Sequence, residues 1–147
     1  MKNSILFVMI SHRMEDLPVT PTLLLYNLDN EHGKKLRLLC ASLKIRVKSI
    51  SSSDYTQTVG ALAGIPGMER SDAIYNETGF TDAMLVFKDF NDPLLDRFLV
   101  TYRKMKLPPI PLKAVLTGQN IAWTSLALHD ELVRESRAIK ESSPASQ

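Results

Sequence analysis

The stretch PPIPLKAVLTGQNIAWTSLALHDELVRE, residues 108–135, carries the most specific local pattern in the chain. Its leading prolines end any helix that precedes them, and the apolar run 112–116 has the length of a strand. The polar residues 117–120 then turn the chain toward a last helix. We expect Asn120 to cap this helix and Trp123, the only tryptophan, to lie one turn inside it with its ring in the core.

Three further strands are predicted upstream of this stretch. Continuous apolar runs at residues 23–26 and 84–87 are typical of strands that are buried on both faces. Residues 45–50 instead alternate between apolar and basic side chains, which favours a strand near the edge of a sheet. The sequence therefore predicts a four-stranded sheet with the first and third strands at its centre.

Helical patterns separate these strands. In residues 31–43, three leucines and Cys40 recur at helical spacing, so we expect Cys40 to pack inward as a small hydrophobic residue. Asp54 and Gln57 match a capping box, which predicts a short helix that begins at Asp54 and stops at Gly64.

The helix of the second half has a clear start in the sequence. Asp92 stands directly before Pro93, so we expect Asp92 to be the cap and the proline to take the first helical position. A broad apolar stripe follows, and the helix is expected to end near Met105, before the prolines.

These elements predict a single α/β domain of order βαβαβαβα over residues 22–141. Its halves, 22–64 and 83–141, are joined by a loop at 65–82, and the strings LLLYNLDN and MLVFKDFN that open the two halves suggest a duplication. Residues 1–21 are expected to be an arm or an extra strand, and residues 142–147 a disordered tail. A three-layer arrangement is preferred, and a two-layer ferredoxin-like α+β sandwich is the alternative.

Composition narrows the classes of partner. The chain has 147 residues, of which 44% are hydrophobic and 23% charged, as in an ordinary globular domain. Its net charge of +2, from 18 basic and 16 acidic residues, is nearly neutral, so we do not expect nucleic acid as a partner. The apolar run at residues 5–10 is too short for a membrane span, and a single cysteine favours an intracellular protein. We therefore expect a cytoplasmic protein without a membrane partner.

No group of residues has the spacing of a catalytic or metal site. His12, His32 and His129 are scattered along the chain, and the cluster His129, Asp130 and Glu131 is interpreted as the solvated face of a helix, because adjacent helical residues point in different directions. The sequence accordingly predicts no catalytic residue, no metal and no cofactor.

Polar residues follow each predicted strand, and in a parallel sheet they would share the carboxyl edge where such sheets bind ligands. The candidate ligand-binding residues are Asp89, Lys113, Thr117, Asn120 and Trp123. The alternative is that these residues only form turns and cap helices, which is their commonest role.

The second half of the chain resembles a known family. The resemblance rests on MLVF from residue 84, LLDRFLVTYRK from residue 94, PPIPLKAVLT from residue 108 and the pattern N-x-x-W-T from Asn120. Together these motifs resemble a bacterial family of short domains of unknown function, found mainly in anaerobic Gram-positive species. The chain departs from the family pattern at Ala127, where an acidic residue is expected. The resemblance implies a cytoplasmic bacterial protein and brings no activity or substrate.

Two functions remain open on these grounds. The leading hypothesis is a small binding or regulatory module without catalysis, and the alternative is a small-molecule enzyme that uses the polar corner after the fourth strand. The sequence does not decide whether the protein is an enzyme. The partners that fit are a second copy of the chain, a small molecule or another protein.

Overall fold

The computed structural model describes residues 20–142, which form one α/β domain. Its strands are β1 (Thr22–Tyr26), β2 (Arg46–Ile50), β3 (Met84–Lys88) and β4 (Lys113–Val115). Its α-helices are α2 (Glu31–Ser42), α3 (Val59–Leu62), α4 (Asp92–Lys104) and α5 (Ser125–Ser142), with 3-10 turns η1 (Ser52–Asp54) and η2 (Asn120–Ala122). The predicted α/β class and element order are confirmed. The predicted arm up to residue 19 and the predicted tail from residue 143 lie outside the described residues.

The sheet is mixed, with the strand order β2-β1-β3-β4. β1 pairs in parallel with β2 and β3 with β4, whereas the two central strands run antiparallel with Leu24 opposite Val86. The carboxyl ends of β1 and β2 therefore lie at one end of the sheet, and those of β3 and β4 at the other. The single polar edge considered from the sequence is not formed, since it required a parallel sheet.

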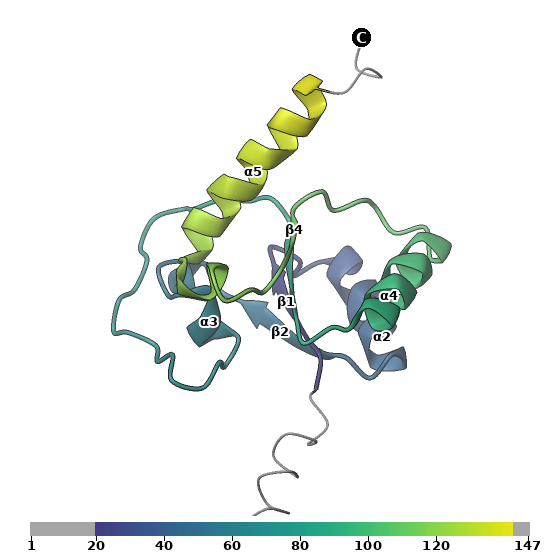
Figure 1. Ribbon diagram of the computed structural model, residues 1–147, viewed down its shortest axis with the longest axis horizontal. Coiled ribbons are helices and arrows are strands. Elements are labelled where there is room, and N and C mark those ends of the chain that lie inside the picture. The colour runs from purple at the N-terminus through teal and green to yellow at the C-terminus, as the bar shows by residue number, and fades with distance from the viewer. Residues whose placement is uncertain (1–19, 143–147) are drawn as a thin grey trace, which may run out of the picture.

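Helices cover both faces of this sheet. On one face, Leu25 and Phe87 pack with α2 and α4 in a core that includes Leu36 and Phe98. The side chains that alternate with them turn to the other face, where α3 and α5 contribute buried leucines such as Leu128. Figure 1 shows α2 and α4 on one side of the strands and α3 and α5 on the other. The fold thus has three layers, the arrangement preferred from the sequence.

The two halves repeat one βαβ unit in detail. The side chain of Asn30 accepts from Gly33 N at 3.0 Å at the start of α2, and Asn91 accepts from Leu94 N at 2.8 Å at the start of α4. Asn91, not Asp92, is therefore the cap of α4, and the predicted start was one residue late. A lysine with positive φ follows each helix, Lys44 at 59° and Lys106 at 56°. These matching caps and turns support the duplication suggested by the sequence.

The helix expected from Asp54 starts later. Thr58 caps α3 by accepting from Ala61 N at 3.1 Å, and the helix stops before Gly64, whose φ is 76°. Asp54 instead pairs with Arg70 at 2.5 Å, and the buried Gln57 side chain bonds to the backbone of residues 71 and 73. The capping-box residues thus anchor the following loop.

That loop, residues 65–82, runs across the second face and is fastened there by aromatic contacts. The ring of Phe80 stacks between Tyr55, with ring centroids 4.4 Å apart, and His129 at 4.0 Å. The amide of Asn27 donates to the carbonyls of Phe80 and Asp82, and His129 Nε2 lies 2.7 Å from an Asp82 carboxylate oxygen. The side chain of His129 is only 12% exposed, so interpreting it as part of a solvated face was wrong.

Candidate functional site

A buried asparagine fixes the corner after β4. Asn120 Oδ1 accepts from Thr117 N at 2.8 Å, its Nδ2 donates to Val115 O at 3.0 Å, and its backbone N–H donates to Thr117 Oγ1 at 3.1 Å. The cap of α5 is instead Thr124, whose Oγ1 accepts from Ala127 N at 3.1 Å. The prediction that Asn120 caps the last helix is therefore wrong, because its side chain is used to close the turn.

Trp123 lies between η2 and α5, in extended conformation with φ −83° and ψ 148°. Its carbonyl accepts from Val59 N at 2.8 Å, and Thr124 forms a bridge with Thr58. These bonds fasten the corner to α3. The ring is half-buried against the core of the second face, so the prediction that Trp123 stands one turn inside the helix is also wrong.

β4 is an edge strand, and half of its backbone turns away from the sheet. Leu112 O accepts from Leu85 N at 3.0 Å, and Leu116 N donates to Phe87 O at 2.9 Å. In a parallel ladder the residues between these bonded positions turn outward, which here are Lys113 and Val115. The carbonyl of Val115 is taken by Asn120, so the N–H and C=O of Lys113 and the N–H of Val115 face outward.

Open hollows flank this edge on both faces of the sheet. The hollow on the α5 side, termed the α5 groove, has a volume of about 310 Å³. Its lining comprises Lys113, Ala114, Val115, Thr117, Gln119, Asn120, Trp123, Leu128, Glu131, Leu132 and Glu135. The hollow on the α4 side, termed the α4 groove, has a volume of about 320 Å³. Its lining comprises Leu99, Tyr102, Arg103, Leu107, Pro109, Ile110 and Lys113.

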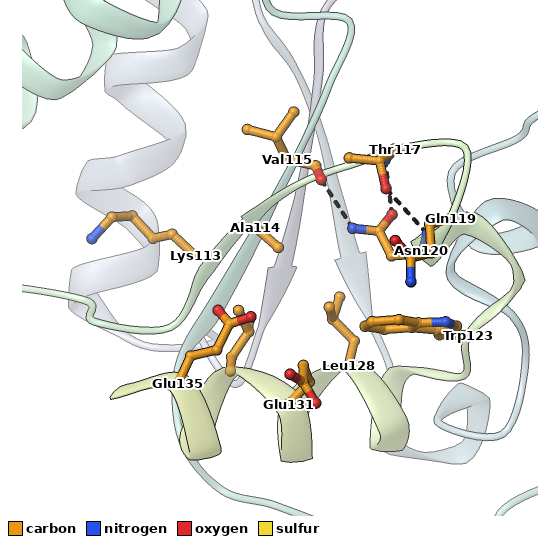
Figure 2. Close-up of a pocket in the computed structure, with 11 residues that line it drawn as sticks. Lys113, Ala114, Val115, Thr117, Gln119, Asn120, Trp123, Leu128, Glu131 and Glu135 are labelled. Carbon is orange, nitrogen blue, oxygen red and sulfur yellow. Dashed lines mark hydrogen bonds between the residues drawn. The ribbon is translucent and has the colours of Figure 1, made fainter. Parts of the chain in front are cut away.

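The α5 groove combines an aromatic ring, carboxylates and an apolar floor. Figure 2 shows Glu135 reaching from α5 toward the strand, Glu131 beside the helix one turn earlier, and the Trp123 ring at the end of the groove nearer the corner. Lys113 points away from both carboxylates, and its Nζ donates to Ile110 O at 2.5 Å. Burial lowers the pKa of Lys113.

Four of the five predicted site residues line the α5 groove: Lys113, Thr117, Asn120 and Trp123. Asp89 does not, since it follows β3 with φ 61° and lies 3.5 Å from the ammonium of Lys88. Among the lining residues, Glu131 and Glu135 had no place in the predicted site. Their spacing of four residues puts them on one helix face, but only the sheet topology sets that face beside a free edge.

Other candidate chemistry is accounted for by packing. Cys40 is fully buried among the core residues of the first face, and burial raises the pKa of its thiol to about 12. Among residues 20–142, no cluster of three His, Cys, Asp or Glu side chains is placed to hold a metal ion. No helix in that part of the chain combines the length and apolarity that a membrane span requires.

A family model described as "Domain of unknown function (DUF3783)" matches residues 83–139. The matched segment runs from just before β3 into the last turns of α5 and contains every residue that lines the two grooves. It overlaps the stretch whose motifs resemble a family of short domains of unknown function. Neither the curated proteins nor the solved structures include a match to this chain.

Proposed function

We propose that this protein is a binding module in which β4 takes an extended segment of another protein as an added strand. The observation that carries the proposal is the outward-turned backbone of Lys113 and Val115 at a sheet edge with hollows on both sides. Strand addition is a common mode of peptide recognition, in which backbone bonds give affinity and flanking pockets accept alternate side chains.

The two edges of the sheet differ in a way that favours β4. On β2, the exposed residues Arg46 and Lys48 place two cations on the outer strand, a common protection against strand pairing. On β4, the side chain of Val115 is 46% exposed and Lys113 is the one basic residue of the strand. An approaching strand therefore meets less charge and more apolar surface at β4.

The polar side chains of the corner after β4 are engaged in structural hydrogen bonds. The Asn120 amide and the Thr117 hydroxyl are engaged with the backbone of the turn, and the Lys113 amine with a carbonyl. Side chains that are held in this way shape the end of the groove. This favours the binding module over the small-molecule enzyme as the function of the corner.

The proposal is tested by selecting a display library of random linear peptides against the full chain. Enriched peptides, once synthesised, are expected to slow amide hydrogen exchange at Lys113 and Val115. Val115→Pro removes an outward N–H at a position where an edge strand tolerates proline. We expect it to weaken peptide binding by about tenfold, since one or more backbone bonds are lost.

The matched control is Val47→Pro. Arg46 N donates to Pro21 O, so Val47 holds the outward position on β2 that Val115 holds on β4. This variant should bind the selected peptides like the wild type. Peptides that bind Val115→Pro as tightly as the wild type, or that protect amides elsewhere, would refute the proposal. Circular dichroism verifies that each variant is folded.

A further inference from the structure

The position of each residue on β4 determines which groove a neighbouring residue of an added strand would enter. Ala114 packs with the core of the α5 face, as do Leu112 and Leu116, whereas the side chains that alternate with them turn to the α4 face. The residues of a strand paired with β4 must alternate in the same way. Every second side chain then enters the α5 groove, and the others enter the α4 groove.

The charges that face the α5 groove are negative on balance. Glu131 and Glu135 line it from successive turns of α5, and the Lys113 ammonium is directed away to Ile110 O. Arg134 pairs with Glu131 at 2.7 Å, but its side chain is 73% exposed and lines an adjoining hollow, which shares Trp123 and Glu131 with the α5 groove but does not include Glu135. The Trp123 ring adds an aromatic surface, which attracts cations over its face.

The α4 groove has a different character. Leu99, Tyr102 and Leu107 give it an apolar lining, and its charges are the cations of Arg103 and Lys113. A basic side chain is therefore disfavoured on this side, and an apolar one fits. The two grooves thus select for opposite properties at alternate positions.

From these observations we infer that the segment taken up by β4 alternates apolar residues with lysine or arginine, and that Trp123, Glu131 and Glu135 hold the basic side chains. The inference rests on the proposed function. A second copy of this chain fits less well, because two β4 strands paired about a two-fold axis would bring the same two carboxylates of each α5 toward one another. The partner is therefore a different protein with a basic, extended segment.

The test uses three synthetic heptapeptides in which valine alternates with lysine, serine or glutamate. Trp123 is the only tryptophan and lines the groove, so its fluorescence reports binding directly. The lysine peptide should bind about tenfold more tightly than the serine peptide, and the glutamate peptide most weakly, as expected for two facing carboxylates. Added salt should reduce the difference between the lysine and serine peptides.

Variants of the groove identify the groups responsible. Glu131→Gln and Glu135→Gln should each weaken binding of the lysine peptide about two- to fivefold and leave the serine peptide unchanged. Trp123→Leu, measured by calorimetry, should weaken binding of the lysine peptide by a similar factor of about two to five. Trp123→Phe keeps an aromatic ring and should bind this peptide almost as tightly as the wild type. Glu69→Gln, on the exposed part of the loop, is the matched control and should have no effect.

The outcomes separate the two proposals. Equal affinities for the three peptides, with Lys113 and Val115 protected from exchange, would overturn the basic pattern and leave strand addition intact. Binding of the lysine peptide to Val115→Pro that is as tight as to the wild type would show attraction without strand pairing and overturn both. Failure of all three peptides to bind would overturn the basic pattern, and a dimer of the chain that Val115→Pro dissociates would overturn both.

Discussion

Replacing Asn120 with alanine tests the hydrogen bonds that close the groove at its corner end. The change removes the bond from Thr117 N to Oδ1 and the bond from Nδ2 to Val115 O, while the backbone bond from Asn120 N to Thr117 Oγ1 remains. Each lost bond contributes about 0.5–1.5 kcal/mol to stability. Asn120 is 7% exposed, whereas Thr117 and Val115 are exposed and can bond to water in the variant. We therefore expect the free energy of unfolding to fall by about 1–3 kcal/mol.

Denaturant unfolding followed by circular dichroism measures this change. Asn120→Asp is an informative second variant, because it keeps the acceptor for Thr117 N and turns the donor into an oxygen that faces Val115 O. It should therefore also be less stable than the wild type. Gln119→Ala, at the exposed neighbouring position, should stay within about 0.5 kcal/mol of the wild type. An Asn120→Ala protein that is equally unaffected would show that the amide does not hold the turn.

Three further predictions follow from burial. Trp123→Ala should lower the free energy of unfolding by about 1–3 kcal/mol, less than the roughly 3–5 kcal/mol of a fully buried tryptophan, because the ring is only partly buried. A loss of about 3–5 kcal/mol in denaturant unfolding would contradict this placement. Cys40 should react with thiol reagents only after unfolding, and rapid labelling of the native protein would contradict its burial. Burial raises the Cys40 pKa from 9.0 to about 12, so the native state keeps a proton that the unfolded chain loses between these values. The contribution of Cys40 to stability should therefore be constant below pH 9 and decrease from there toward pH 12, and the stability of Cys40→Ala should fall less steeply over this range.

Local sequence patterns predicted the central strands correctly, because burial on both faces restricts such strands to apolar residues. The runs at 23–26 and 84–87 became the central strands because residues covered on both faces must all be apolar. The start of the last helix was harder to predict. Asn120 and Thr124 are both residues that cap helices, and the choice depends on contacts of the corner with α3, such as the bond from Val59 N to Trp123 O, which join distant parts of the chain.

The direction of the central strands was beyond local reasoning, and it decides what the site can be. Each βαβ unit is fixed by its own short connections, but the orientation of β3 relative to β1 depends on how the loop 65–82 crosses the second face. The contacts of Phe80 with Tyr55 and His129 that fasten this loop are spread over the whole sequence.

Antiparallel central strands place a βαβ unit on each side of the sheet centre and leave β4 as a free edge with α5 across it. In the sequence, Glu131 and Glu135 have only the pattern of a solvated helix face. In the structure, the same two carboxylates line a groove beside an edge strand that has outward-facing backbone donors. Both grooves are lined wholly by residues of the matched segment 83–139, but the bond from Val59 N to Trp123 O shows that α3, which precedes this segment, holds the corner end of the α5 groove in place.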